Sequence, residues 1–409
     1  MKGAVHHVRA EDFRDEAGRI CIGGRPVADI VREAKHTPLY IYDAQRIRQR
    51  ISHLREHLPP VVKIHYAMKA NPNHQVVELI ARLVDGIDVA SSGELEVALL
   101  TNTRPLDISF AGPGKRTAEL QRAIQSGIVI NVESERELER IYQLSFSANR
   151  KANVAVRVNP DFELKGSGMR MSGGPKPFGI DAERVPEVLR SIDSDRCVFH
   201  GFHIFTGSQN LNAAAICEAQ SKAFDLAMQL SRDAPTPPKF INLGGGIGIP
   251  YFPGETAVDI APIGANLAKL SAALRDNYPQ CEMIIELGRY IVGEAGIYVC
   301  EVIDRKVSRG QTFLVTDGGL HHHLALSGNF GQVIRRNYPV AFAAPPSGDM
   351  EEVSIVGPLC TPLDILADKM TLPRADVGDL VVVFQSGAYG FTASPRGFLS
   401  HPEPMEILF

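Results

Sequence analysis

Residues 63–92, KIHYAMKANPNHQVVELIARLVDGIDVASS, contain two short runs rich in β-forming residues, separated by a stretch long enough for a helix. Six more such runs follow. Their starts lie 21–25 residues apart up to residue 153 and 42–44 residues apart after it. Intervals of this length allow a helical crossover from each strand to a parallel neighbour. The eight predicted strands start at Lys63, Asp85, Asp107, Ile128, Asn153, Cys197, Lys239 and Glu282. This arrangement predicts an α/β protein built on a (β/α)8 TIM barrel.

The sequence changes character after about residue 296. Runs such as IYVCEVIDRKV (297–307) and DLVVVFQSGAY (379–389) have turn residues between them and little room for helices, which predicts a separate all-β domain. The early run RICIGGRPVADIV (19–31) also has strand character. We therefore expect an N-terminal segment (1–36) that joins the β domain, a barrel (37–295) and a C-terminal β-barrel or sandwich (296–409).

The overall composition favours small-molecule chemistry. There are 43 Lys and Arg residues against 47 Asp and Glu residues, giving a formal charge of −4, and no basic patch suited to nucleic acid or anionic lipid stands out. The N-terminus lacks the apolar stretch of a signal peptide, and the six cysteines show no CxxC spacing. These features predict a cytoplasmic protein that binds neither nucleic acid nor membranes and holds no metal.

Residues that can do chemistry fall at the ends of the predicted strands, where barrel enzymes place their reactive groups. In strand order they are Lys69, Asp88, Arg157, Ser208, Gly244 to Gly246, and Glu286 with Arg289. Lys69 ends an apolar strand, so its ammonium needs a counter-charge or its pKa falls, and a desolvated lysine can form a Schiff base. The alternative for Lys69 is a surface ion pair.

The glycines of residues 244–248 offer backbone N–H groups to an anion. The third glycine of a dinucleotide fingerprint is missing and Pro250 follows, so one phosphate group is the better fit, with a tight turn as the alternative. Glu286 could hold a protonated ring nitrogen and Arg289 could contact a phosphate, unless the two form an ordinary ion pair. A reactive lysine, a monophosphate loop and a carboxylate for a ring nitrogen together match the needs of pyridoxal 5′-phosphate (PLP).

The sequence also resembles a known family, the fold-type III PLP-dependent decarboxylases of the diaminopimelate, ornithine and arginine decarboxylase group, whose barrel is alanine racemase-like. The motifs that carry the resemblance are YAMKANPN (66–73), DVASSGELE (88–96), GSQ (207–209), LGGGIG (243–248), ELGRYIVGEAG (286–296), GPLCTPLD (357–364) and GAYGF (387–391). They occur in order over most of the chain.

The resemblance implies a role for each matching residue. Lys69 would form the Schiff base with PLP, and Glu286 would face the pyridine nitrogen. The residues implied to hold the phosphate are Ser208, Gly244, Gly245, Gly246, Arg289 and Tyr389. Asp88, Glu94 and Arg157 match charged residues of the cofactor pocket. Cys360 matches a thiol that reaches across a homodimer interface and protonates Cα after carbon dioxide leaves.

Three departures from the family pattern concern the ring and the substrate. Phe205 stands where the family commonly has His, and His203 lies on the same strand face, so both are candidates to stack on the ring. Thr361 follows Cys360 where the family commonly has an acid that contacts a distal ammonium. The region after Leu320 lacks the family's arginine pattern for diaminopimelate. The remaining substrate candidates are Arg335, Arg336, Thr361 and Asp364.

These departures make diaminopimelate doubtful and suggest a carrier-protein-bound aminoacyl substrate as an alternative to a free amino acid. The predicted activity is amino-acid α-decarboxylation. The alternatives are amino-acid racemisation and a non-catalytic decarboxylase-like regulator. Three consecutive histidines, His321 to His323, cannot all face one metal ion, so we interpret them as lining of the substrate mouth or as a surface loop. We interpret His53 and His57, at i, i+4 spacing, as part of a solvated helix face.

Overall fold

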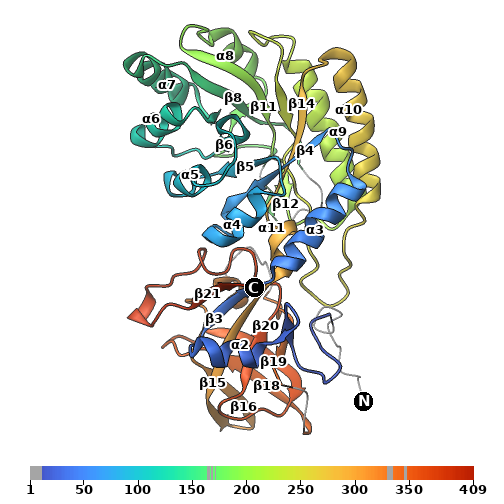
Figure 1. The fold of residues 1–409 in the computed structure, drawn as a ribbon, viewed down its shortest axis with the longest axis vertical. Helices are drawn as coiled ribbons and strands as arrows, with labels where there is room; N and C mark the ends of the chain where they lie inside the picture. Colours follow the sequence, from blue (N-terminus) through green and yellow to red (C-terminus); the bar gives the residue numbers. More distant parts are fainter. Residues whose placement is uncertain (1–11, 164–165, 167–168, 171, 329–334, 345–347) are drawn as a thin grey trace. The chain divides into compact units, whose positions relative to one another are not determined.

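The structure is a computed structural model that describes residues 12–163, 166, 169–170, 172–328, 335–344 and 348–409. The chain forms two compact units (Figure 1). The barrel unit comprises Arg48–Ile249 and Ala257–Tyr290. The β unit comprises Met1–Ile47, Pro250–Thr256 and Ile291–Phe409.

Eight parallel strands form a closed barrel, which confirms the predicted fold. They are β4 (Val62–Ala67), β5 (Gly86–Val89), β6 (Ile108–Phe110), β7 (Val129–Val132), β8 (Ala152–Asn159), β11 (Cys197–His203), β13 (Phe240–Asn242) and β14 (Glu282–Leu287). Each strand pairs with the next, and β14 pairs in parallel with β4 to close the ring. The strand β10 (Ile180–Asp181) adds to β8, and β9 (Met169–Arg170) pairs with β12 (Gly207–Ser208).

Helices connect successive barrel strands and lie around them (Figure 1). The connecting helices are α4 (His74–Ala81), α5 (Ser92–Leu99), α6 (Thr117–Ser126), α7 (Glu135–Ala148), α8 (Val185–Ser191), α9 (Ala213–Leu230) and α10 (Ala261–Asn277), while α3 (Ala44–His57) precedes β4 and α11 (Arg289–Val292) follows β14. Local sequence sets several starts. Ser91 accepts a hydrogen bond from the Glu94 backbone N–H at α5, and Ser134 does the same for Glu137 at α7. None of the helices among the described residues has the length and apolar content needed to cross a membrane.

The β unit is all-β apart from short helices, as predicted. Its longest strand, β15 (Gly296–Ser308), pairs with β3 (Leu39–Tyr42), β16 (Gln311–Thr316) and β20 (Leu380–Val383). The remaining strands of this sheet are β17 (Val340–Phe342), β18 (Met350–Val356), β19 (Ile365–Pro373) and β21 (Met405–Leu408). Strands β1 (Cys21–Ile22) and β2 (Arg25–Pro26) form a separate hairpin that leads into α2 (Val27–Ala34).

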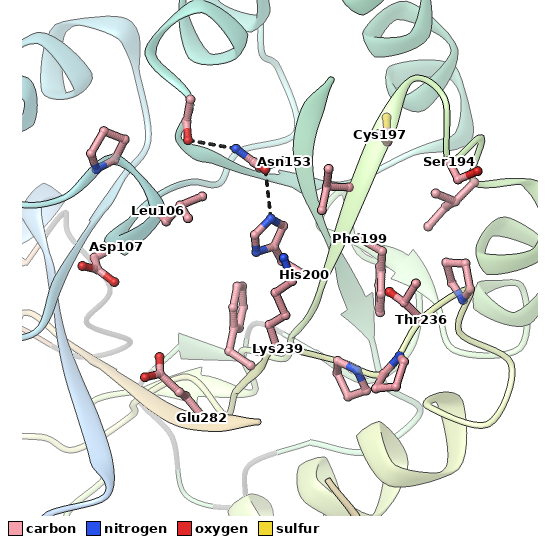
Figure 2. A pocket seen from close by; sticks show the side chains of 18 of the residues that line it. Leu106, Asp107, Asn153, Ser194, Cys197, Phe199, His200, Thr236, Lys239 and Glu282 are labelled. Atoms are coloured by element: carbon pink, nitrogen blue, oxygen red, sulfur yellow. Dashed lines mark hydrogen bonds between the residues drawn. The ribbon is translucent and has the colours of Figure 1, made fainter. Parts of the chain in front are cut away.

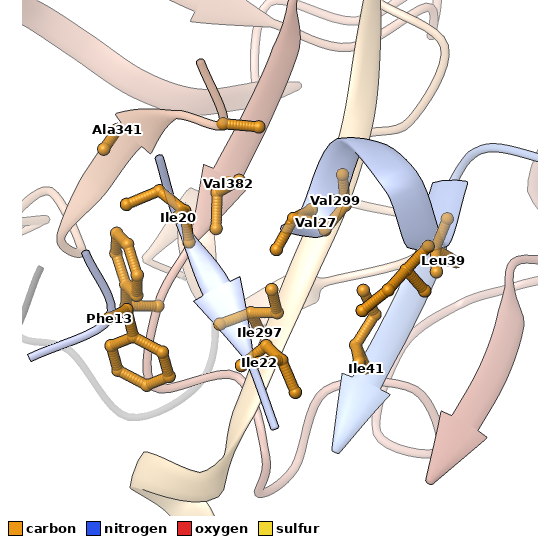
Figure 3. Close-up of a cluster of buried hydrophobic side chains, with 13 residues drawn as sticks. Phe13, Ile20, Ile22, Val27, Leu39, Ile41, Ile297, Val299, Ala341 and Val382 are labelled. Carbon is orange, nitrogen blue, oxygen red and sulfur yellow. The ribbon is translucent and has the colours of Figure 1, made fainter. Parts of the chain in front are cut away.

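The N-terminal segment packs into the core of the β unit. Ile20, Ile22 and Val27 are fully buried in one apolar cluster with Ile297 and Val299 of β15 (Figure 3). Because β3 pairs with both β15 and β21, the β unit extends to Ile47, eleven residues beyond the expected end of the N-terminal segment at 36. It also takes in residues 250–256, which we expected in the barrel. The first boundary differs because β3 pairs with distant strands, and the second because residues 250–256 contact side chains such as Tyr338 and Arg336.

The three consecutive histidines are not on a surface loop. His321, His322 and His323 are each 0% exposed inside the β unit, so that interpretation was wrong. A ring nitrogen of His322 lies 2.9 Å from the Pro402 carbonyl oxygen, and one of His323 lies 3.0 Å from Ser386 Oγ. Neither ring nitrogen of His321 has a partner among the described residues. Burial lowers the pKa values of His321, His322 and His323 to about 3, about 4 and about 3.

This burial predicts acid-sensitive folding. An unfolded histidine takes up a proton near its ordinary pKa of 6.5, whereas the folded ones stay neutral, so the free energy of unfolding falls as the pH drops below 6.5. Each histidine contributes a slope of about 1.4 kcal/mol per pH unit. We expect His321→Leu to reduce proton uptake on urea unfolding at pH 5.5 by about one proton. The control His74→Gln, at an exposed position, alters a histidine that is hydrated in both states. Equal uptake by His321→Leu and the unaltered protein would contradict the prediction.

Candidate functional site

The centre of the site is an ion pair between the first and last barrel strands. Lys69 follows β4 in a 3-10 turn (Met68–Ala70), and Glu286 lies on β14. The Lys69 Nζ atom lies 3.6 Å from Glu286 Oε1. The Lys69 side chain is 44% exposed, whereas that of Glu286 is 5% exposed. The lysine therefore has the counter-charge that its position at the end of an apolar strand requires, and its amine stays accessible.

Glu286 is held as a carboxylate. Burial raises its pKa, but the positive charge of Lys69 and the hydrogen bond and charge of His203 outweigh burial and keep the pKa well below its usual value. The second carboxylate oxygen, Oε2, lies 2.9 Å from His203 Nε2. His203 is buried on β11, and its Nδ1 has no partner among the described residues. The chemistry open to Glu286 is to stabilise a positive charge placed against it.

Phe205 supplies an aromatic face beside this pair. Its ring centre lies 5.0 Å from Lys69 Nζ and 6.5 Å from the His203 ring centre. His203 contacts the Glu286 carboxylate directly, so its ring is committed to that hydrogen bond. Phe205 is therefore the better placed of the two to cover a flat ring next to the lysine.

Two loops form a cradle next to Glu286. The Gly244–Gly246 loop follows β13, and a Cβ atom at Gly245 would lie 1.8 Å from the Glu286 carbonyl oxygen, so only glycine fits there. The Asn210 backbone N–H donates to the Gly246 carbonyl oxygen at 2.9 Å and ties this loop to the one carrying Ser208. The Ser208 Oγ atom is buried and has no partner among the residues described. A buried, unsatisfied hydroxyl beside a glycine loop fits a phosphate group.

A buried polar network fills the barrel interior beneath Lys69. Asp88 Oδ1 accepts a hydrogen bond from Ser109 Oγ at 2.5 Å and lies 3.1 Å from His65 Nδ1. Asn131 Nδ2 donates to Ser109 Oγ at 3.1 Å. Burial lowers the pKa of His65, but the charge and hydrogen bond of Asp88 raise it more, so the net shift is upward. Asp88 therefore contacts His65, which was not among the predicted site residues.

The other predicted charged residues also have partners in the barrel unit. Arg157 Nη1 lies 2.8 Å from Glu133 Oε1, and both side chains are buried. Glu94 accepts a hydrogen bond from the Ala90 backbone N–H at 2.7 Å, so it closes the start of α5. Glu133 was missed, although it directly follows β7. The rule that reactive residues follow strands would have found it.

Arg289 begins α11 in the barrel unit, and the remaining predicted residues lie in the β unit. Cys360 is exposed on the loop between β18 and β19, with Thr361 next to it. Both carboxylate oxygens of buried Asp364 accept backbone hydrogen bonds, at 2.6 Å from Leu320 and 2.9 Å from Leu359, which gives this residue a structural use. Tyr389 has a positive φ of 55°, a conformation that few non-glycine residues adopt.

The two arginines differ in their contacts. Arg336 pairs with Glu255 at 3.2 Å and lies over the Phe252 ring. Arg335 donates one hydrogen bond to Asn337, but its Nε and Nη2 atoms are buried without a partner among the described residues. A half-buried guanidinium with such N–H groups can donate hydrogen bonds to an oxygen-rich group.

A cavity of about 1250 Å³ lies at the opposite, N-terminal ends of the barrel strands (Figure 2). There the Asn153 side chain donates to the Gly127 carbonyl oxygen and contacts His200 Nε2 at 2.9 Å. Burial lowers the pKa of His200 to about 4, so the imidazole is neutral. Barrel enzymes carry out chemistry at the other end, so this cavity is separate from the candidate site.

Comparisons with known proteins agree with this geometry. A family model described as "Pyridoxal-dependent decarboxylase, pyridoxal binding domain" matches residues 44–293. The L-glutamyl-[BtrI acyl-carrier protein] decarboxylase of Niallia circulans is 40% identical over 91% of this chain and 88% of that protein. The 2-[(L-alanin-3-ylcarbamoyl)methyl]-2-hydroxybutanedioate decarboxylase of Staphylococcus aureus is 30% identical over 93% and 96%. The solved diaminopimelate decarboxylase of Helicobacter pylori, in complex with L-lysine, has a TM-score of 0.83 at 27% identity and covers 93% of this chain and 94% of its own.

Proposed function

The chain belongs to the pyridoxal-dependent decarboxylases, and from that premise we propose that it removes the α-carboxylate of a glutamyl group bound to an acyl-carrier protein. It is a PLP-dependent carboxy-lyase of amino-acid metabolism, and the racemase and regulator alternatives gain no support from its relatives. The substrate, the proton donor and the shared dimer site are the parts that we propose.

The chemistry of the reaction defines how the substrate is tethered. The α-amino group must be free to react with the cofactor, and the α-carboxylate must be free to leave. A glutamyl group can therefore be attached to its carrier only through the side-chain carboxyl. The distal end of such a substrate is a neutral acyl oxygen followed by a long arm.

The observation that carries the proposal is Thr361. It stands beside Cys360, where an acidic side chain would be needed to bind a distal ammonium. The distal ammonium of a diamino acid therefore meets a hydroxyl at this position instead of a carboxylate. The unused donors of Arg335 suit an acyl oxygen and would not suit an ammonium. The similarity to a glutamyl-carrier decarboxylase points the same way.

The proposed roles of the residues combine the contacts described above with the family resemblance. PLP, when bound, accepts the electrons released as the bond to the carboxylate breaks. Lys69 would hold the cofactor covalently, and the Glu286 carboxylate, hydrogen-bonded to His203, would hold a proton at the ring nitrogen. Ser208, the 244–246 amides, Arg289 and Tyr389 would hold the phosphate, and Phe205 would lie against the ring. Asp88, with His65, and Arg157, with Glu133, keep the surrounding charges in place.

The substrate is tested by measuring carbon dioxide release from the PLP-loaded enzyme. The panel is glutamate on a carrier protein, glutamyl-pantetheine thioester, and free glutamate, diaminopimelate, lysine, ornithine and arginine. We expect kcat/KM for the carrier-bound substrate to exceed that for free amino acids by about 100-fold or more, since remote binding contributes to catalysis. Arg335→Gln should raise KM, whereas the exposed control Arg374→Gln should not. A free diamino acid turned over as fast as the tethered substrate would overturn the proposal.

We further propose that the enzyme is a homodimer in which Cys360 of the partner subunit protonates Cα. This predicts complementation. Lys69→Ala and Cys360→Ala proteins are each expected to be inactive, because one lacks the covalent anchor and the other the proton donor. Mixing them under exchanging conditions should restore activity, since hybrid dimers contain one intact site. The control is Lys69→Ala protein taken alone through the same exchange procedure, which should stay inactive. If the mixture of the two variants recovers no activity, the shared site is refuted.

A further inference from the structure

A trio of metal-binding side chains lies on the exposed face of α3. One ligand atom each from His53, Glu56 and His57 lies within 4.8 Å of the others, and it is the one such group among the described residues. The two histidines were expected on a solvated helix face, and Glu56 was not among the candidate residues. The positions i, i+3 and i+4 place all three side chains on adjacent turns of one helix face.

The contacts of His57 prepare it as a ligand. Its Nδ1 atom lies 2.9 Å from the His53 carbonyl oxygen, so Nδ1 carries the proton and donates to that oxygen. The Nε2 lone pair is then left for a metal ion. Metal-binding histidines commonly have their other ring nitrogen held by a backbone carbonyl in this way. The His53 and His57 ring centres are 4.4 Å apart, so both imidazoles can reach one ion.

The surroundings also suit a cation. Among the charged side chains near His53, that of Arg50 is positive. Arg50 lies over the Tyr290 ring, with its guanidinium 4.7 Å from the ring centre. The carboxylates of Glu56 and Asp259 act on His53 with the opposite sign, so both favour positive charge near it. An ion bound here would meet two imidazoles and a carboxylate.

The end of α3 is held rigidly. The His57 carbonyl oxygen faces Gly264 of α10, where a Cβ atom would approach to 1.9 Å, so only glycine allows this packing. Leu54 on the inner face of the helix and Leu58, directly after its end, are buried. A fixed backbone lowers the entropy that ordering the ligands would otherwise cost.

We propose that His53, Glu56 and His57 bind a divalent transition-metal ion such as Zn²⁺, Ni²⁺ or Cu²⁺. Two imidazoles and one carboxylate suit these ions, whereas Ca²⁺ and Mg²⁺ prefer oxygen ligands. Three ligands from one helix leave coordination positions for water or for a further ligand. The bound ion links two turns of α3 and stabilises that helix. The inference is independent of the proposed substrate.

The test is calorimetric titration of the PLP-loaded enzyme with ZnCl2 at pH 7.5. We expect one site per chain whose affinity falls about tenfold or more in His53→Gln and in His57→Gln, and also falls in Glu56→Gln. The matched control is His74→Gln, which alters another exposed histidine and should leave the site intact. These surface variants are not expected to change the decarboxylase activity measured without added metal.

A second measurement identifies the ligands. The electron paramagnetic resonance spectrum of the enzyme loaded with one equivalent of Cu²⁺ should show coupling to two nitrogens, and the double variant His53→Gln/His57→Gln should lose it. Zn²⁺ should raise the melting temperature of the unaltered enzyme but not of the double variant. The inference is overturned if the double variant binds as many Zn²⁺ ions with the same affinity. An unchanged affinity in Glu56→Gln would remove Glu56 from the site.

Discussion

Replacing Lys69 with alanine will abolish the visible absorbance of the PLP-loaded protein and lower kcat/KM by at least ~10³-fold, the largest effect expected of any substitution here. The side-chain amine contacts Glu286 and can hold the cofactor covalently, and it follows the end of β4 with 44% of its side chain exposed. An alanine leaves the carboxylate and the aromatic face in place but removes the anchor.

The control for this substitution lies on the same strand. Lys63, at the other end of β4, pairs with Asp85 and Glu282 at 3.9 and 3.8 Å. Lys63→Ala removes an equal charge far from the candidate site and is expected to keep both absorbance and activity. The measurement is an absorbance spectrum and a carbon dioxide assay on both variants. Unchanged colour in Lys69→Ala would show that another residue binds the cofactor.

Glu286→Gln should lower kcat by about 10²- to 10³-fold while the cofactor stays attached to Lys69. Glutamine keeps the shape of the side chain but removes its negative charge. In the unaltered protein Lys69 and His203 keep the Glu286 carboxyl group ionised. A neutral amide cannot keep a proton on the pyridine nitrogen, so the ring becomes a weaker electron acceptor. The expected signature is retained visible absorbance with lost turnover.

Glu282→Gln provides the matched control. Glu282 begins the same strand, β14, with 49% of its side chain exposed, and its contact is with Lys63. We expect its kcat to equal that of the unaltered enzyme. Carbon dioxide release under saturating substrate, measured for both variants, checks the prediction. An active Glu286→Gln enzyme would mean that the ring nitrogen does not depend on this carboxylate.

The barrel could be predicted because its signals are local. Each strand is a short β-rich run, each crossover needs a minimum length, and both can be counted along the chain. The domain boundaries could not be placed this way. Strand β3 belongs to the β unit because it pairs with β15, more than 250 residues later, and local composition does not record that pairing.

Burial of polar residues was equally hidden from the sequence. A run of three histidines resembles a surface loop, yet the β unit buries all three, because packing from distant segments decides whether a polar side chain meets water. His65 lies in an ordinary strand pattern. Its contact with Asp88 appears only when β4 and β5 lie side by side.

The sequence by itself determined the fold class, the family and the cofactor, because the order of the motifs and the spacing of the strands can be read along the chain. Only the tertiary structure decided which charges meet. Lys69 and Glu286 are far apart in sequence and become neighbours because the barrel closes by pairing β4 with β14. The electrostatic state of each group depends on distances of a few ångströms, and those distances exist only once the strands are in register.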